Sequence, residues 1–270
     1  MGNDQLTRHA VNIRRHILKM MLESKSSHIG SCFSIVEILT LLYFEVLKIE
    51  PENPLERGRD RFILSKGHGS AALYATLAEA GLIPEEQLRG YYQDGGKLPG
   101  HLDRFSIPFV ESSAGSLGHG LSIGLGMALA SQRNAVSGKV VVLLGDGECN
   151  EGSVWEAVML ASHLKLSNLH VIVDCNRIQS FGMTGEVINL DPLGAKWKAF
   201  GWEVDEGDGH DFDEIRFFLE KAASVPRVLI ANTIKGKGVS FMENSLEWHY
   251  RSPSDEQYEK ALAELDGSSN

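Results

Sequence analysis

An aspartate stands between two glycines at the end of an apolar run. The run is KVVVLLG at residues 139–145, and Asp146 and Gly147 follow it directly. Glycines beside an acid let the backbone approach a ligand closely. A carboxylate about 4 Å from a diphosphate charge costs on the order of 4 kcal/mol at an effective dielectric of about 20, whereas a helix N-terminus returns only about 0.3–1 kcal/mol. If this loop binds a diphosphate, it needs a divalent cation between acid and phosphates, and Asp146 would be a metal ligand.

A second apolar run supplies further oxygen ligands. Magnesium prefers an octahedron of oxygens from one or two carboxylates, a carbonyl, phosphates and water. The run LHVIVDCN at 169–176 ends on Asn176, and the backbone carbonyl of Ile178 lies just beyond it. Taken singly, residues 145–147 fit a tight turn and Asn176 fits a turn position, because Gly, Asp and Asn are common turn formers. Their occurrence after two consecutive predicted strands favours a magnesium site made of Asp146, Asn176 and Ile178.

The predicted elements bring these loops to one edge of a sheet. Apolar residues at helical spacing predict two opening helices, over residues 5–23 and 34–47. Continuous apolar runs separated by helical stretches then indicate a parallel sheet that is covered on both faces. The predicted strands are RFILS at 61–65, KVVVLLG at 139–145, LHVIVDCN at 169–176, WEV at 202–204 and RVLIANT at 227–233. Ligands of such sheets bind beyond the carboxyl ends of the strands.

Length and composition fit one α/β domain. A chain of 270 residues with 43% hydrophobic content can bury a full core. We therefore expect a doubly wound, mostly parallel sheet with helices on both faces. No linker divides the chain, so residues 1–265 should form a single domain with a helical N-terminal extension, and residues 266–270 a disordered tail.

The charge balance argues against nucleic acid as a partner. The formal charge is -10, from 36 acidic against 26 basic residues, which leaves no basic stripe for a phosphate backbone. The N-terminal stretch has neither a secretory apolar region nor a membrane-spanning segment. Three cysteines without CxxC spacing suit a reducing compartment. We expect a soluble, cytoplasmic protein that binds no membrane.

Several separated motifs resemble the N-terminal domain of transketolases. GDGECNEG followed by DCNRI resembles the thiamin diphosphate motif, which opens with GDG, closes with an asparagine and also occurs in pyruvate dehydrogenases. The narrower matches are KSSHIGS at 25–31, DRFILSKGHGSAALY at 60–74, LPGHLD at 98–103, GSLGHGLSIGLGMA at 115–128 and WHYRSP at 248–253. They occur in order over nearly the whole chain. The resemblance implies the thiamin diphosphate-binding fold, with this chain as its diphosphate-binding domain.

The resemblance also assigns residues to the cofactor. It implies that thiamin diphosphate binds through a magnesium ion held by Asp146, Asn176 and the carbonyl of Ile178, and that calcium or manganese can substitute. Residues assigned to the diphosphate and its loop are His68, Gly145, Gly147, Glu148 and His249. Backbone groups assigned to the aminopyrimidine ring belong to Gly115, Ser116 and Leu117.

Four histidines are assigned to catalysis by the same resemblance. They would line the cleft where the sugar meets the cofactor, and they are His28, His68, His101 and His249. Ketol transfer moves protons at each step, and imidazole titrates near neutral pH. The histidines interpreted instead as surface or packing residues are His9, His16, His163, His170 and His210.

One group that the chemistry requires is missing. Thiamin chemistry needs a carboxylate against the aminopyrimidine, and in the family a glutamate of the second domain supplies it. The resemblance therefore implies a partner chain with the pyrimidine-binding and C-terminal domains, in a heterotetramer with two copies of each chain. The expected activity is transfer of a two-carbon ketol unit from a ketose phosphate to an aldose phosphate, and only with that partner.

Three alternatives remain open. A 1-deoxyxylulose-5-phosphate synthase has a segment similar to TIKGKGVSFME followed by WH, although LSKGHGS and LPGHLD favour transketolase. A nicotinamide dehydrogenase would need an uncharged glycine loop and an acid about twenty residues later, and Asp146 counts against it. A non-catalytic paralogue would pair with another chain without binding the cofactor.

Overall fold

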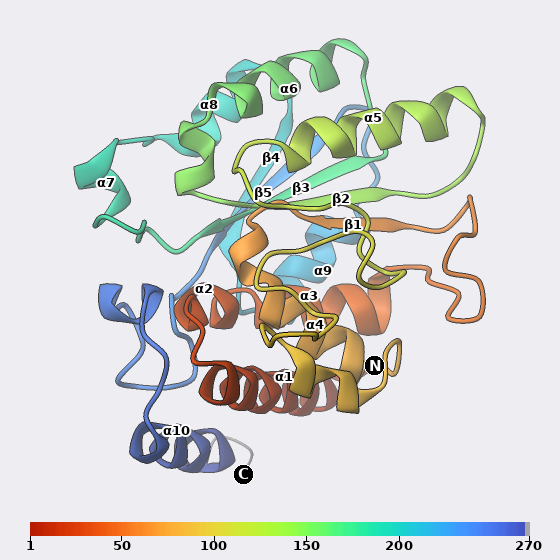
Figure 1. The fold of residues 1–270 in the computed structure, drawn as a ribbon. Coiled ribbons are helices and arrows are strands. Elements are labelled where there is room, and N and C mark those ends of the chain that lie inside the picture. The colour runs from red at the N-terminus through yellow and green to blue at the C-terminus, as the bar shows by residue number, and fades with distance from the viewer. Residues whose placement is uncertain (268–270) are drawn as a thin grey trace.

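The computed structural model describes residues 1–267 and contains one parallel sheet between two layers of helices (Figure 1). The strands lie in the order β1–β2–β3–β5–β4, and every neighbouring pair is parallel. Their bounds are Arg61–Leu64 for β1, Val140–Gly145 for β2, Leu169–Cys175 for β3, Glu203–Asp208 for β4 and Arg227–Asn232 for β5. The predicted α/β class is confirmed. Strand β4 extends beyond its short apolar run to Asp208, because an edge strand keeps polar, half-exposed side chains that an apolar pattern does not detect.

Helices cover both faces of the sheet (Figure 1). One face carries α5 (Gly120–Arg133), α6 (Gly152–His163) and α8 (Leu193–Ala199). The other carries α2 (Ile29–Phe33), α3 (Val36–Leu41), α4 (Ser70–Glu79) and α9 (Phe212–Glu220). Short α7 (Thr184–Val187) lies in the loop after β3, and a π-helical turn, Leu42–Val46, continues α3. Within the described residues no helix is both long and apolar enough to cross a membrane.

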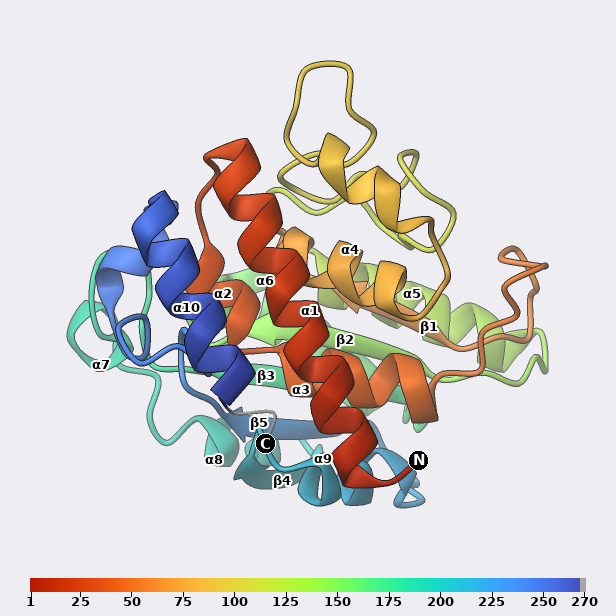
Figure 2. The ribbon, with the colours of Figure 1, turned by 90° about the horizontal axis from the view of Figure 1, so that it is seen from below.

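The two terminal helices form an outer layer. Helix α1 (Asn3–Ser24) packs on α3 and α4, and α10 (Asp255–Gly267) runs beside α1 (Figure 2). Helices α1 and α3 match the two predicted opening helices. Helix α10 takes in residues 266 and 267 of the expected tail, and Asp266 pairs with Arg15 at 2.5 Å. Residues 268–270 lie outside the described residues.

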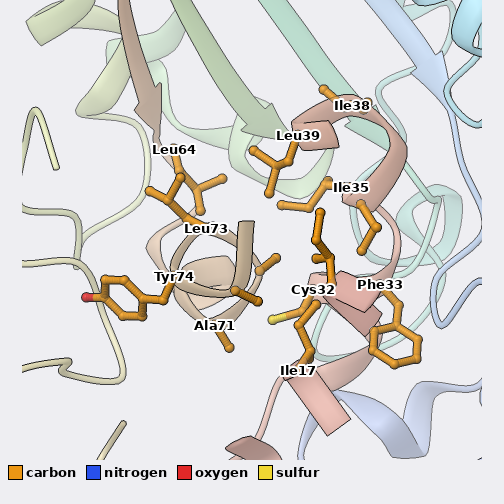
Figure 3. Packing of buried hydrophobic residues seen from close by; sticks show 14 of the residues in the cluster. Ile17, Cys32, Phe33, Ile35, Ile38, Leu39, Leu64, Ala71, Leu73 and Tyr74 are labelled. Carbon is orange, nitrogen blue, oxygen red and sulfur yellow. The ribbon is translucent and has the colours of Figure 1, made fainter. Parts of the chain in front are cut away.

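Alternate side chains of the central strands face two separate cores. Leu64 and Leu143 point into the core shared with α1 to α4, and Figure 3 shows Leu64 there beside Leu73. Ile63 and Val142 point into the core shared with α5 and α6. Both faces of the central strands are therefore buried, which explains why their sequences are continuous apolar runs.

Close packing at the carboxyl edge of the sheet requires glycine at two positions. A Cβ added at Gly67 would lie 2.1 Å from the carbonyl oxygen of Ala114, and one at Gly120 would lie 2.4 Å from Ser65 Oγ. The loops after β1 and before α5 are consequently held against each other. This contact places the segment 115–118 beside the loops that follow β2 and β3.

A pair of glycines on α5 tests the packing of that helix on the sheet. A Cβ at Gly124 would lie 2.5 Å from Val142 Cγ2, whereas a Cβ at Gly126 would meet nothing within 4 Å. We expect Gly124→Ala to lower the free energy of unfolding by about 1–3 kcal/mol through overpacking. Gly126→Ala should raise it by up to about 1 kcal/mol through helix propensity. Urea denaturation measures both, and equal effects of the two substitutions would contradict this packing.

Candidate functional site

A cavity of about 380 Å³ opens at the carboxyl ends of β1, β2 and β3. Its lining brings together residues that are far apart in the sequence. The predicted site residues among them are His68, Leu117, Gly145, Asp146, Gly147, Glu148, Asn176, Ile178 and His249. Gly115 and Ser116 lie in the exposed loop that leads to Leu117. His28 lies beside His68 and His249, and His101 lies beside His28; neither is part of the lining itself.

Asp146 follows β2 and is only 5% exposed. Its Oδ1 accepts a hydrogen bond from Gly147 N at 2.7 Å, and its Oδ2 accepts from Arg177 N at 2.6 Å and Thr184 Oγ1 at 3.2 Å. Burial, together with the nearby Asp174 carboxylate, raises the pKa of Asp146 above its ordinary value. A cation at this carboxylate would relieve both effects.

The other two predicted metal ligands belong to the same hydrogen-bonded cluster. Asn176 Oδ1 accepts from Ile178 N at 3.1 Å, and its Nδ2 donates to Asp174 Oδ2 at 2.9 Å. The Ile178 carbonyl accepts from Lys235 Nζ at 2.8 Å. Because the peptide N–H after Asn176 donates to Asp146, the three predicted ligands are brought to one place.

This donor set suits a hard cation that brings an anion with it. Among residues 1–267, no three His, Cys, Asp or Glu side chains are grouped to hold a metal by themselves. Magnesium does not need such a group, because phosphate and water oxygens complete its octahedron. Carbonyl and amide oxygens have two lone pairs each, so Asn176 Oδ1 can bind a cation and keep its present hydrogen bond. At Ile178 O the donor is the Lys235 ammonium, which a bound cation would repel toward the accompanying anion.

Two further polar side-chain atoms at the cavity lack a hydrogen-bond partner within the described residues. Asn150 Oδ1 and Gln179 Nε2 are buried and have no hydrogen-bond partner within the described part of the chain. Buried polar atoms of this kind cost free energy when they stay unpaired. One is an acceptor and the other a donor, so the cavity is suited to a polar ligand that carries both kinds of group.

A neutralised ion pair lies at the base of the cavity. Lys66 Nζ is 2.5 Å from Asp174 Oδ2 and also donates to the Ser31 carbonyl at 2.8 Å. Asp174 accepts further hydrogen bonds from Ser34 Oγ at 2.7 Å and from Thr233 Oγ1. Burial alone would raise the pKa of Asp174, but Lys66 and these hydroxyls hold it below its ordinary value. Asp174 therefore stays ionised and neutralises Lys66.

Lys235, by contrast, is a buried cation without an acidic partner. Its side chain is 1% exposed, and Nζ donates to the Ile178 carbonyl and, at 2.9 Å, to His249 Nδ1. In the described residues no carboxylate forms an ion pair with it. Burial and the charge of Lys66 lower the pKa of Lys235 to about 8. Near neutral pH its ammonium is still charged and is suited to an anion in the cavity.

The four predicted catalytic histidines form one cluster. Ring centroids lie 5.2 Å apart for His28 and His68, 5.0 Å for His28 and His249, and 6.0 Å for His28 and His101. Burial, followed by nearby positive charges, lowers the pKa of His28 to about 4 and that of His249 to about 3, and lowers the pKa of His68 well below its ordinary value. These three rings are therefore neutral at pH 7, and each can both donate and accept a hydrogen bond.

Glu148 braces the loops around the cavity. Its Oε1 accepts from Ser65 Oγ and from Gly118 N at 2.8 Å, and its Oε2 accepts from Gly145 N at 3.1 Å. Burial raises the pKa of this carboxyl. Both of its oxygens are engaged with the protein, so Glu148 fixes the spacing of three loops instead of extending a free carboxylate toward a ligand.

Comparison with known proteins identifies the family. Residues 6–265 match the family described as transketolase, thiamine diphosphate binding domain. The chain belongs to the transketolase family. This transketolase domain is 44% identical over 268 residues to one subunit of an apulose-4-phosphate transketolase from Actinobacillus succinogenes, in a match that covers 98% of this chain and 97% of the relative. It is 42% identical to a 6-deoxy-6-sulfo-D-fructose transketolase subunit of a Clostridium species, with 96% and 95% covered.

A solved structure extends the likeness to the fold. Transketolase from Campylobacter jejuni superposes with a TM-score of 0.92 at 32% identity, and the match covers 98% of this chain. It covers only 43% of the Campylobacter chain, so the transketolase domain described here spans less than half of that protein. Membership of this family disfavours the nicotinamide dehydrogenase alternative.

Sequence reasoning missed the three charged residues that surround the predicted ligands. They are Lys66, Asp174 and Lys235. Lys66 and Asp174 stand within matched transketolase motifs, so a charged residue at the end of an apolar strand was an available signal. Lys235 lies in TIKGKGVSFME, just after the predicted strand at 227–233, so a similar signal was available. Its burial could not be predicted, because it follows from how the loop after β5 folds back over β3.

The lowered pKa of Lys235 predicts a pH dependence of stability. Between about pH 8 and pH 10.5 the unfolded chain keeps a proton that folded Lys235 has released, so the free energy of unfolding should rise with pH. The contribution is up to about 3 kcal/mol for a difference of this size. Lys235→Met should lack it, and subtracting the two curves removes the other titrating groups. Parallel curves from urea denaturation of the cofactor-free proteins would contradict a buried charged Lys235.

Proposed function

We propose that this chain is the diphosphate-binding subunit of a two-chain transketolase, which transfers a two-carbon ketol unit from a ketose to an aldose. The observation that carries the proposal is one cavity with a metal-ligand set around Asp146 and an unneutralised cation, Lys235. A diphosphate bound to a divalent ion would complement both, since Asp146 would hold the ion and the Lys235 ammonium would attract the phosphates. Thiamin diphosphate supplies the electron sink that cleavage of a carbon–carbon bond beside a carbonyl requires.

The residues that would hold the cofactor follow from the cluster of oxygens. Asp146, Asn176 and the Ile178 carbonyl would bind magnesium, and calcium or manganese could occupy the same oxygen site. His68, His249 and Lys235 would contact the diphosphate. Other predicted contacts are those of Gly145 and Gly147 with the diphosphate, and of Gly115, Ser116 and Leu117 with the aminopyrimidine.

The absence of a side chain at Gly147 supports its predicted role. A Cβ there would lie 2.8 Å from Gln179 Cγ and would close the gap between the loops after β2 and β3. Glycine keeps the backbone N–H of this loop open to a phosphate oxygen. Glu148 would contribute by bracing the same loop.

The histidine cluster would handle protons at the sugar. His28, His68 and His249 are neutral at pH 7, so the unprotonated nitrogen of His28 or His68 can accept a hydrogen bond from a sugar hydroxyl and take its proton. His249 Nδ1 accepts from Lys235, so its Nε2–H can donate to a ligand oxygen. His101 is exposed at the rim of the cluster, where an incoming sugar would reach it first. The catalytic roles of all four residues remain part of the proposal.

A partner chain completes the proposed enzyme. The reported relatives of matching length are named as subunits, and the Campylobacter transketolase has more than half of its chain outside the match. We propose that a partner contributes the pyrimidine-binding and C-terminal domains, the carboxylate for the aminopyrimidine and the groups that bind a sugar phosphate. Two copies of each chain would form a heterotetramer in the cytoplasm.

Loss of the proposed metal ligand should abolish cofactor binding. Asp146→Asn keeps the shape of the side chain but removes its charge, so the magnesium-dependent affinity for thiamin diphosphate should fall by more than about 100-fold. Asp94→Asn, which removes one exposed charge away from the cavity, is the control. Isothermal titration calorimetry measures both, and an Asp146→Asn affinity equal to that of the wild type would refute the metal assignment.

Turnover should depend on the second chain. The purified chain should bind magnesium and thiamin diphosphate but show no ketol transfer, because under the proposal the carboxylate that acts on the aminopyrimidine belongs to the partner chain. Adding the candidate partner should restore turnover in a coupled assay. Activity of the isolated chain would contradict the proposal that catalysis requires a partner chain. Cofactor binding without activity in the pair would favour a non-catalytic paralogue.

A further inference from the structure

Lys235 sits on a loop whose position depends on a few hydrogen bonds. The loop, residues 233–238, follows β5 and has no regular secondary structure. Gly236 N donates to the Gly30 carbonyl at 3.0 Å, and Asn244 N donates to the Lys235 carbonyl at 2.9 Å. The position of the ammonium in the cavity is therefore set by the loop backbone on either side of Lys235.

A buried series of hydrogen-bonded side chains, Arg14–Glu37–His210, also contacts this loop. Arg14 on α1 donates to both carboxylate oxygens of Glu37 on α3, at 2.6 and 2.9 Å. Glu37 in turn contacts His210 Nδ1 at 2.8 Å through Oε2. All three side chains are shielded from solvent, with exposed fractions of 5%, 11% and 9%.

The two ends of this hydrogen-bonded series of side chains, His210 and Arg14, bind the loop before and after Lys235. Ile234 N donates to His210 Nε2 at 2.8 Å, and Arg14 Nε donates to the Lys237 carbonyl at 2.8 Å. Ile234 immediately precedes Lys235, and Lys237 is two positions after it. The Arg14–Glu37–His210 chain of side chains thus holds the loop on both sides of the lysine.

The direction of each bond is fixed by chemistry. A backbone N–H can only donate, so His210 Nε2 must accept from Ile234 and the ring proton must lie on Nδ1, where it faces Glu37. Burial alone would raise the pKa of Glu37, but Arg14 and His210 lower it to about 2, so the carboxylate is ionised and accepts from both. A neutral imidazole with one tautomer is the only form that satisfies both contacts.

We propose that His210 is a positioning residue for Lys235, which acts by holding the loop at Ile234 while Arg14 holds it at Lys237. The proposal rests on the proposed function, in which the Lys235 ammonium meets a diphosphate. His210 was expected from the sequence to be a surface or packing residue. The structure places it instead at the end of a buried chain that leads to the cavity.

Three substitutions separate positioning from simple packing. His210→Leu keeps the apolar bulk but loses both hydrogen bonds. His210→Gln offers an amide that can donate to Glu37 and accept from Ile234, so it should rescue the loop. His9→Leu is the matched control, because His9 Nδ1 contacts Glu79 Oε1 at the same 2.8 Å between α1 and α4, away from the cavity.

The first measurement needs no ligand. Nuclear magnetic resonance of the full chain, labelled at lysine and histidine, reports the His210 tautomer and the position of the Lys235 side chain. The wild type should show a proton on His210 Nδ1 and a nuclear Overhauser contact between the Lys235 side chain and the His249 ring. His210→Leu should weaken or remove that contact, whereas His210→Gln and His9→Leu should keep it. An unchanged contact in His210→Leu, or a proton on Nε2 in the wild type, would overturn the proposal.

The second measurement links His210 to the cofactor site. With thiamin diphosphate and magnesium, His210→Leu should weaken binding about tenfold, as expected for a misplaced charged hydrogen bond, and His9→Leu should lower the melting temperature without weakening binding. In a Lys235→Met background, His210→Leu should cause no further loss. An equal loss in both backgrounds would show that His210 does not act through Lys235. If the wild type does not bind the cofactor, the proposed function fails, and the ligand-free measurement still decides the role of His210.

Discussion

Asp146 and Lys235 are buried at one cavity with opposite charges, and within the described residues they form no ion pair. Taking a charge out of water costs several kcal/mol unless a partner is supplied. The nearby Lys66 and Asp174 are partners for each other, with Lys66 Nζ 2.5 Å from Asp174 Oδ2. Asp146 is instead surrounded by hydrogen-bond donors, and Lys235 by neutral acceptors. The fold therefore holds two separated charges apart, which is the arrangement that a cation–diphosphate ligand would neutralise from both sides.

The rest of the structure supplies the rigidity that this separation requires. Each charge sits beyond the carboxyl end of a different strand, so the parallel sheet sets the distance between them. Glu148 braces the loops after β1 and β2, while the Arg14–Glu37–His210 chain braces the loop after β5. These braces are themselves buried polar groups with satisfied hydrogen bonds, and such networks rigidify a site when every member is paired. Two hydrophobic cores then anchor the strands from which the loops start.

Sequence reasoning recovered the features that local patterns encode. The central strands are buried on both faces, so their apolar runs located them, and Asp146 and Asn176 stood out as polar residues at the ends of such runs. The edge strand β4 was predicted only over its first residues, and the last turn of α10 was not detected, because half-exposed elements have polar residues. The burial of Lys235 and of His210 could not be predicted from the sequence. His210 is buried by contacts with residues more than a hundred positions away, and Lys235 is buried because the loop after β5 folds back over β3.

The division between this chain and a partner also bears on substrate choice. The two reported subunit relatives are named for different sugars, yet they are 44% and 42% identical to this chain. Under the proposed function, the groups gathered here bind the diphosphate, the metal and the reacting end of the sugar, which all ketoses share. A similar cavity could then serve different substrates, because under the same proposal the groups that recognise the distal end of the sugar lie outside it. Selection on this chain would act mainly on the placement of Asp146 and Lys235, and selection for a particular sugar mainly on its partner.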